Sequence, residues 1–343
     1  MASPAAEPTP EPLFILRGLN GAVNALCFHA RTDLGESGDP DWLIAGGRCG
    51  RCWTRTTPKG IAGVAALASA NQIATQGRDG FLRLWDMGRP ASSRADAVCS
   101  IPVDTVTFCK LSVLDAGLGQ AGGPLAAVPS LDMTRTQVMD LTTQQVICSV
   151  PFDRDAKHGT CTSVKLYRDA ATQDVRLLAG YEGGEVVLYS ITAGKVISKI
   201  HRHQEGVLSV QASLDEPRIG FSCGIDDVVS SFSLETNQPL QVANEVRLPQ
   251  HGCNELAIRP DGKLVATGGW DSKVRVFSAR SLKQLAVLRL HTDSVHAVAF
   301  SHPLRRSKER GHMLLATGSK DERIGLWSLY PPPTASSRAS VSS

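Results

Sequence analysis

Four segments of the chain share one pattern of residues: QGRDGFLRLWD at 76–86, AGYEGGEVVLY at 179–189, TGGWDSKVRVF at 267–277 and TGSKDERIGLW at 317–327. Each runs from a small residue and glycine, through a turn residue, into alternating apolar positions that stop at an aromatic residue. A repeated unit of this size buries its apolar face against its neighbours, so the pattern predicts a repeat architecture.

The polar residues of these segments also repeat at a fixed spacing. Thr317 and Asp321 lie ten and six residues before Trp327, and His291 lies upstream of the apolar run 295–300. The pattern resembles the WD repeat, one four-stranded blade of a β-propeller. The resemblance implies that the aspartate lies in the turn between the second and third strands, where it joins the histidine, the Ser/Thr hydroxyl and the indole in one hydrogen-bond network. The residues of this network are Thr75, Asp79, Trp85, Ser222, Asp226, Thr267, Asp271, His291, Thr317, Asp321 and Trp327.

A polar set that recurs in several copies serves the repeat, because buried polar groups need partners. We therefore interpret His291 and Asp321 as structural rather than catalytic. The sequence shows no convergent set of nucleophile, base and metal ligands. It predicts a protein that is not an enzyme and that has no catalytic residue, no cofactor and no metal site.

Counting the weaker copies gives seven. Their last residues fall near Trp53, Trp85, Met139, Tyr189, Phe232, Phe277 and Trp327, and their innermost strands are predicted at 23–28, 60–67, 103–109, 162–166, 207–212, 255–258 and 295–300. Period-two alternation in these runs is typical of strands with one buried face. Seven blades of about 40–45 residues fit the span 13–330. The predicted fold is an all-β, seven-bladed WD-repeat β-propeller in which one or two blades are degenerate or truncated.

A closed ring also needs its last sheet edge covered. The short apolar strand PLFILRG at 12–18 precedes the first repeat, and IGLWSLY at 324–330 ends the last one. We expect the two to pair. The proline-rich leader 1–12 and the tail 331–343 are predicted to be disordered, and 13–330 to form one propeller domain.

Composition excludes several classes of protein. Hydrophobic residues make up 42% of the chain and charged residues 20%, with a formal net charge of +3. This balance does not indicate nucleic-acid binding. The sequence contains no apolar run of about 18 residues that would span a membrane, and its start shows neither a secretion signal nor a myristoylation site. The 9 cysteines are scattered without a disulfide framework and indicate reduced thiols in an intracellular compartment.

Three local motifs have structural interpretations. Cys49 and Cys52 form a C-x-x-C without a second ligand pair, so we interpret them as part of a turn. The basic segment HPLRRSKERGH at 302–312 lies between the first and second strands of the last repeat and is interpreted as a solvated insertion. The glycine-rich stretches lack the spacing of phosphate-binding loops.

A narrower resemblance rests on PLFILRG, QGRDGFLRLWD, LLAGYEGGEVVLY, LATGGWDSKVRVF and ATGSKDERIGLWSLYPP, in this order. Together they resemble the WD-repeat family that contains the guanine nucleotide-binding protein β-subunit-like protein 1 and the fungal ASTRA-associated protein 1. The resemblance covers about 13–332. It implies an adaptor linked to the ASTRA assembly, to chromatin remodelling and to the maturation of phosphatidylinositol-3-kinase-related kinases. The implied partners are ASTRA components and the HEAT-repeat co-chaperone named for telomere maintenance, in the nucleus and cytoplasm. No membrane, nucleic acid or small-molecule substrate is expected.

The sequence departs from the repeat at several places. Only 32 residues separate Trp53 from Trp85, too few for a whole blade, so the first or second blade is reduced or the sequence has lost a segment. The fourth repeat has Gly183 in place of the turn aspartate, and the third has lost most of the pattern.

Two other functions compete with the adaptor. A substrate receptor of a cullin-type ubiquitin ligase is the first, but the W-D-x-R ending typical of that class is one residue out of register at Trp85. A G-protein β-like signalling scaffold is the second, and its N-terminal helix would not fit the proline-rich leader.

Partners of a propeller bind its loops, because its strands are already paired. Trp270 precedes the turn residue Asp271, at the position where other repeats carry Arg78 or Lys320. An aromatic residue in a turn is a candidate interface anchor, although a ring packed on a neighbouring blade is an equal alternative. Tyr181 lies in the matching turn of the fourth repeat and is predicted to share this face.

Overall fold

The computed structural model describes residues 10–17, 21–29, 42–47, 60–88, 96–103, 108–115, 122–130, 132, 134–152, 158–213, 218–235, 238–303 and 313–330. Within these residues the chain forms strands and turns, and no helix. The described residues therefore include no helix that is long and apolar enough to cross a membrane. Most of the predicted leader, and all of the tail 331–343, lie outside them, so their disorder stays a prediction.

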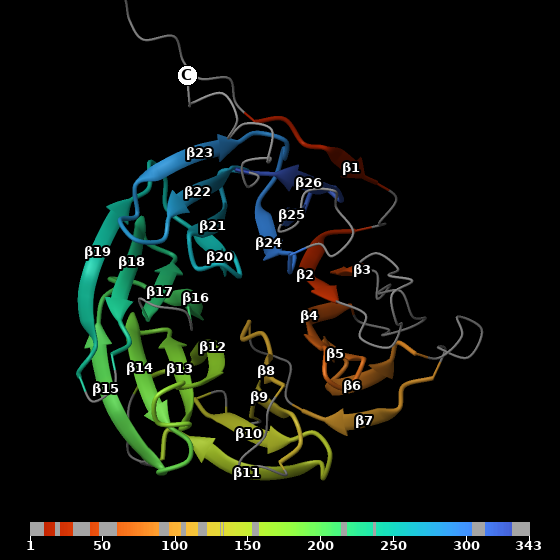
Figure 1. The fold of residues 1–343 in the computed structure, drawn as a ribbon, viewed down its shortest axis with the longest axis vertical. Coiled ribbons are helices and arrows are strands. Elements are labelled where there is room, and N and C mark those ends of the chain that lie inside the picture. The colour runs from red at the N-terminus through yellow and green to blue at the C-terminus, as the bar shows by residue number, and fades with distance from the viewer. Residues whose placement is uncertain are drawn as a thin grey trace, which may run out of the picture.

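The strands form seven antiparallel sheets around a central axis, numbered here in chain order (Figure 1). Sheet 1 contains β2 (Val23–His29) and β3 (Trp42–Gly47); sheet 2 contains β4 (Ile61–Leu67), β5 (Gln72–Gly77), β6 (Phe81–Asp86) and β7 (Cys99–Pro102); sheet 3 contains β8 (Ser112–Leu114), β9 (Leu125–Pro129), β10 (Thr136–Asp140) and β11 (Gln145–Val150). Sheet 4 contains β12 (Cys161–Arg168), β13 (Val175–Tyr181), β14 (Glu185–Ser190) and β15 (Lys195–His201); sheet 5 contains β16 (Val207–Ala212), β17 (Ile219–Gly224), β18 (Val228–Ser233) and β19 (Gln241–Arg247). Sheet 6 contains β20 (Cys253–Ile258), β21 (Leu264–Gly269), β22 (Val274–Ser278) and β23 (Gln284–Leu288); sheet 7 contains β24 (Val295–Phe300), β25 (Leu314–Ser319), β26 (Ile324–Ser328) and β1 (Phe14–Leu16).

The predicted all-β propeller is confirmed with six four-stranded blades. The prediction of seven such blades is not confirmed, because sheet 1 has two strands among the described residues. Its predicted end, Trp53, lies outside them.

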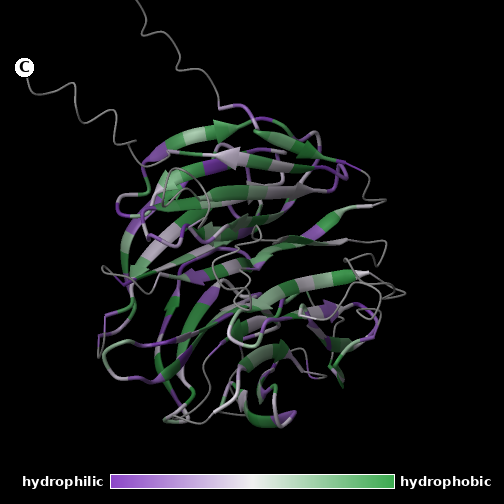
Figure 2. Ribbon diagram, turned by 45° about the vertical axis from the view of Figure 1, so that its right-hand side comes forward, coloured by the Kyte–Doolittle hydropathy of each residue, from purple (hydrophilic) through white to green (hydrophobic). Residues whose placement is uncertain are grey.

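The apolar core lies between the sheets. The described residues form seven buried apolar clusters, and each cluster combines residues of two neighbouring sheets. Hydrophobic positions follow the strands, and hydrophilic positions gather in the turns (Figure 2). Sheet 1 obeys the same rule: Leu26 packs toward sheet 7, whereas Ile44 packs toward sheet 2. Each sheet is thus stabilised by a neighbour on both faces.

The innermost strand of sheet 3 was predicted at 103–109, and this position is wrong. The inner strand is Ser112–Leu114, and Phe108 lies outside any strand with 79% of its surface exposed. The Gln76 side chain explains the difference. Its amide donates to the carbonyl of Cys109 at 3.0 Å and accepts from the N–H of Leu111 at 2.7 Å. The Gln76 side chain thus provides hydrogen-bond partners for the backbone groups of Cys109 and Leu111, which a neighbouring strand would otherwise provide.

The ring closes as predicted. β1 pairs antiparallel with β26, with Phe14 opposite Leu326 and Leu16 opposite Ile324. The N–H of Leu13 adds a hydrogen bond to the carbonyl of Leu326 at 2.7 Å. The N-terminal strand β1 is therefore the outer strand of sheet 7, and the other three strands of that sheet come from the C-terminal repeat.

A β-bulge recurs near the start of six inner strands. In each case the register shifts after the first residue of the strand, which leaves one residue unpaired. The bulged residues are Asn24, Ala62, Thr162, Leu208, Asn254 and His296. All six line one cavity at a mouth of the central channel.

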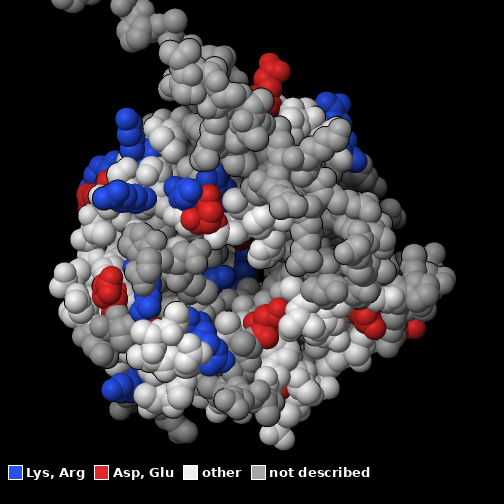
Figure 3. Space-filling view, viewed as in Figure 1, with Lys and Arg blue, Asp and Glu red and all other residues white. Residues whose placement is uncertain are grey.

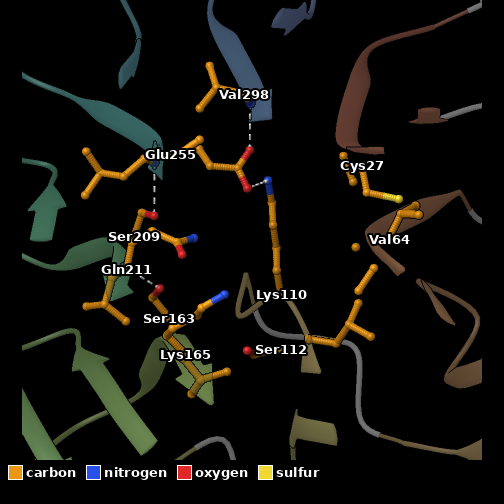
Figure 4. Close-up of a pocket in the computed structure, with 18 of the residues that line it drawn as sticks. Cys27, Val64, Lys110, Ser112, Ser163, Lys165, Ser209, Gln211, Glu255 and Val298 are labelled. Atoms are coloured by element: carbon orange, nitrogen blue, oxygen red, sulfur yellow. Dashed lines mark hydrogen bonds and ion pairs between the residues drawn. The ribbon is translucent and has the colours of Figure 1, made fainter. Parts of the chain in front are cut away.

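Side chains also join one inner strand to the next around the channel (Figure 4). The hydroxyl groups of Ser112, Ser163 and Ser209 accept the backbone N–H groups of Leu166, Val210 and Leu256, respectively, at 2.9–3.1 Å. Glu255 takes the corresponding place in sheet 6 and accepts the N–H of Val298 at 3.1 Å. These four hydrogen bonds connect the inner strands of sheets 3 to 7 in sequence around the channel.

We predict that deleting residues 1–18 lowers the melting temperature by at least about 5 °C, because it removes β1 and exposes the edge of β26. Differential scanning fluorimetry of the deletion variant measures this change. Deletion of residues 1–9 alone is the control and should leave the melting temperature unchanged. Equal melting temperatures for both deletions would show that closure does not stabilise the ring.

Candidate protein-interaction site

The predicted polar network is present in sheet 7. The Nδ1 of His291 lies 3.1 Å from the Asp321 carboxylate, and its Nε2 lies 2.9 Å from the Thr317 hydroxyl. The indole N–H of Trp327 donates to the same hydroxyl at 3.0 Å. Asp321 also accepts the backbone N–H groups of Thr292 and Arg323. These contacts occupy the polar atoms of the turn, which supports a structural role for Asp321.

Sheet 5 repeats this arrangement. His203 bridges Asp226 at 2.9 Å and Ser222 at 2.8 Å, and the buried ring of Phe232 stands where sheet 7 has tryptophan. Burial alone would raise the pKa of the Asp226 carboxyl, but the hydrogen bond and charge of His203, with backbone N–H donors, hold it below its usual value. The carboxylate is therefore kept ionised by its own repeat.

In sheets 2 and 6 an arginine, rather than a histidine, pairs with the turn aspartate. Arg83 pairs with Asp79 at 2.8 Å, and Arg275 pairs with Asp271 at 2.6 Å. Thr75 accepts the Trp85 indole N–H at 2.9 Å. The Thr267 hydroxyl donates to the carbonyl of Arg275 at 3.5 Å. Neither arginine was predicted from the sequence, although each lies four residues after its aspartate, the spacing at which the two side chains can pair.

Sheet 4 departs from the network, and Tyr181 is not part of an exposed face. Its side chain is fully buried, and its hydroxyl lies 2.8 Å from that of Tyr189. Tyr181 ends β13, and its ring packs in the core between sheets 3 and 4. Gly183 stands in this sheet where the turn aspartate is expected, and the two tyrosines lie in the core instead. Tyr181 is therefore not a partner contact, contrary to the prediction.

One residue per turn is placed around the mouth of the channel. The backbone N–H of Arg78, Glu182, Ile225, Trp270 and Lys320 donates to the carbonyl of Gly60, Thr160, Gly206, Gly252 and Ser294, respectively, at 2.8–3.0 Å. This shared bond fixes the backbone of each turn residue while its side chain carries no role in the network. The repeat thereby presents a set of variable side chains on one face.

The mouth of the channel is a cavity of about 630 Å³. Trp270 lines it with 44% of its surface exposed. The indole N–H donates to the amide oxygen of Asn254 at 2.7 Å. The ring covers Gly252, where an added Cβ would lie 2.1 Å from it and where φ is +90°. One side of the ring is thus fixed on its own blade, and the other side is open.

Other apolar side chains complete this surface. Leu208 and Ile225 of sheet 5 line the same cavity, as does the exposed ring of Phe108 from the segment before β8. The sequence analysis placed Phe108 in an inner strand and therefore missed it as a surface residue. We call the cavity lined by Trp270, Phe108, Leu208, Ile225 and Arg78 the funnel.

Positive charge gathers on one side of the funnel. Burial lowers the pKa of His296, and the charges of Lys110, Lys320 and Arg78 lower it further, against the opposing effect of Asp293. Lys320 is paired with Asp293 at 3.3 Å. Arg78 is exposed and has no ion pair with any other described residue. Figure 3 shows one face of the ring, hollowed near its centre, with basic and acidic side chains around the hollow.

An ion pair connects the funnel to the channel below it (Figure 4). The ammonium group of Lys110 lies 3.2 Å from the Glu255 carboxylate and donates to the carbonyl of His296 at 3.0 Å. The pair joins sheet 3 to sheet 6 across a channel of about 360 Å³. Burial raises the pKa of Glu255, and Lys110 opposes that shift. Neither residue was singled out by the sequence analysis.

Other motifs of the sequence add no site. Cys49 and Cys52 and most of the basic segment 302–312 lie outside the described residues. Within the described ranges no cluster of three metal-ligating side chains occurs. Those ranges contain seven free cysteines, of which Cys109, Cys161, Cys223 and Cys253 are buried.

Comparison with known proteins gives a consistent family. The model of the WD domain, G-beta repeat, matches residues 244–278 and 282–328. The guanine nucleotide-binding protein subunit beta-like protein 1 of Mus musculus is 34% identical over 339 residues, which cover 95% of this chain and 98% of that protein. The chain belongs to this WD-repeat family.

Fungal proteins extend the family. The ASTRA-associated protein 1 of Schizosaccharomyces pombe is 28% identical over 386 residues, covering 94% of this chain and 99% of that protein. The ASTRA-associated protein 1 of Aspergillus niger is 25% identical over 439 residues, covering 94% and 98%. The resemblance noted in the sequence is therefore confirmed over nearly the whole chain.

We predict that Asp321→Ala lowers the free energy of unfolding by about 1–3 kcal/mol, because His291 and two backbone N–H groups lose their acceptor. Chemical denaturation measures the loss. Partner binding should decrease only as far as the folded fraction does. A variant of full stability that no longer binds partners would identify Asp321 as a contact residue instead.

We also predict that Lys110→Met lowers the free energy of unfolding by about 1–3 kcal/mol, because the partly buried Glu255 carboxylate loses its partner. Adding Glu255→Gln should restore most of this stability, since glutamine still accepts the N–H of Val298. A double-mutant cycle measured by denaturation gives the coupling. Additive effects of the two substitutions would show that the pair contributes nothing.

Proposed function

We propose that this chain is a non-enzymatic scaffold of an ASTRA-like assembly and that its partners bind at the funnel. The observation that carries the proposal is the open side of Trp270 beside the exposed Phe108, at a cavity that the structural network of the repeats does not use. Exposed aromatic side chains held in a fixed position are frequent binding hot spots. The ASTRA part of the proposal rests on the names of the fungal relatives.

The finer proposal follows the resemblance of the sequence. We propose that the scaffold supports the maturation of phosphatidylinositol-3-kinase-related kinases and chromatin remodelling, with the HEAT-repeat co-chaperone as one partner. It would act in the nucleus and cytoplasm. The turn aspartates support the absence of catalysis, because their carboxylates are occupied by the histidine, arginine and backbone donors of their own repeats.

We further infer that sheet 1 is the inner half of a seventh blade. It has the same bulge as five other inner strands, and it packs between sheets 7 and 2 in the same way as the complete sheets pack on their neighbours. A sheet placed in this way occupies one position of a seven-membered ring.

We predict that Trp270→Ala weakens capture of the co-chaperone partner by about 1–2 kcal/mol, or roughly 5- to 30-fold, without loss of stability. Affinity purification of tagged variants followed by quantitative mass spectrometry measures the capture. Ile147→Ala is the control, because Ile147 is also partly exposed but lies on the outer strand β11. Equal capture by wild type and Trp270→Ala at matched melting temperatures would remove Trp270 from the interface. Failure of the wild type to capture any ASTRA component would overturn the assembly itself.

A further inference from the structure

The funnel combines exposed apolar side chains with an exposed arginine, a combination that can bind a peptide. We infer that it binds an acidic peptide segment of a partner, in which one large apolar side chain is flanked by a carboxylate. This inference rests on the proposed scaffold function and names the kind of segment that the funnel selects.

The apolar half of the funnel fits one large side chain. Trp270 is fixed by its bond to Asn254 and by the flat backbone of Gly252, so binding costs it little conformational entropy. Phe108 comes from the segment before β8, a strand that lies across the ring from β20 (Figure 1), and Leu208 and Ile225 line the cavity with them. An aliphatic or aromatic side chain placed here would bury its surface against two rings and two aliphatic side chains.

The charge on the rim selects an anionic neighbour of that side chain. Arg78 lines the cavity, is exposed, and pairs with no carboxylate of the described residues. Lys110 and Lys320 are each paired with a carboxylate, so Arg78 supplies the unpaired positive charge among the described residues on this side. Glu182 lies on the sheet 4 side of the cavity and accepts the N–H of Thr160 at 3.3 Å. The funnel is therefore positive at Arg78 of sheet 2 and negative at Glu182 of sheet 4, which orients a bound segment.

The same charges favour a carboxylate over a phosphate. Phosphate groups are usually bound by several free arginine or lysine donors. Here Lys110 is paired with Glu255 and Lys320 with Asp293, and the lowered pKa of His296 keeps its ring neutral at pH 7. The one guanidinium at this site that pairs with no carboxylate of the described residues, that of Arg78, matches one or two carboxylates. The segment is thus an acidic peptide rather than a phosphopeptide.

Display of random peptides of about 12 residues on phage, panned against the full chain, tests this inference. The recovered peptides should be enriched in Asp and Glu next to Leu, Ile, Phe or Trp. Fluorescein-labelled copies of them should bind with a dissociation constant that rises at high salt, because the Arg78 contact is exposed. Recovery of no peptide, or of neutral or basic peptides, overturns the inference.

Matched variants locate the two halves of the site. Trp270→Ala and Phe108→Ala should each weaken binding of the recovered peptide by about tenfold or more. Arg78→Glu should weaken it similarly, and a peptide with Lys in place of the acidic residues should then bind the variant better than the wild type. Lys195→Glu, at the outer-strand turn on the opposite face, is the charge-matched control. Unchanged binding to Arg78→Glu or Trp270→Ala, at melting temperatures equal to that of the wild type, overturns the inference.

Further results distinguish a failure of the acidic-peptide inference from a failure of the proposed scaffold function. A phosphoserine peptide that binds more than about tenfold tighter than its acidic counterpart would overturn the carboxylate in favour of phosphate. If the Trp270→Ala, Arg78→Glu double variant still captures ASTRA components from cells, the scaffold function stands and the funnel inference fails. If wild type captures none of them while the acidic peptides bind the funnel, the peptide site stands and the ASTRA assignment fails.

Discussion

Every sheet of this protein is covered on both faces by another sheet, and the rest of the structure depends on that constraint. The described residues place an apolar cluster in each space between neighbours. A row of such sheets leaves two uncovered faces unless its ends meet, so the burial of apolar surface drives the row into a ring. The pairing of β1 with β26 then holds the ends of the chain together. The bulged residues converge on one mouth only because the ring is closed.

The repeat separates structural from functional positions within a single turn. The aspartate is held by histidine in sheets 5 and 7 and by arginine in sheets 2 and 6. The residue before it has a fixed backbone and a side chain outside the aspartate network, which is Arg78, Ile225, Trp270 or Lys320 in these sheets. The side chain at that position therefore differs from sheet to sheet while the turn backbone stays the same. A nearly symmetric ring thereby acquires an asymmetric face.

The irregular third repeat contributes to this face because it has lost its pattern. Gln76 of the preceding sheet binds the backbone of Cys109 and Leu111 and replaces part of the strand ladder. Phe108 is thereby left outside the strand and exposed beside the cavity. Lys110, two residues on, reaches across the channel to Glu255 and couples the two sides of the ring. Degeneration of one repeat has therefore produced an aromatic ring and a cation at the proposed site.

The blade type, the inner strands of six sheets, the closing pair and the histidine network of sheets 5 and 7 follow from the sequence, because each depends on local spacing. Only the tertiary structure decided where Tyr181 and Phe108 lie. The alternation at 103–109 looks like a strand, but the inner strand begins at Ser112, after a backbone that the amide of Gln76 binds at Cys109 and Leu111. Tyr181 lies in a turn motif, but its ring is buried in the apolar cluster between sheets 3 and 4, with its hydroxyl beside that of Tyr189. Exposure and charge at the funnel arise between repeats, and no single repeat encodes them.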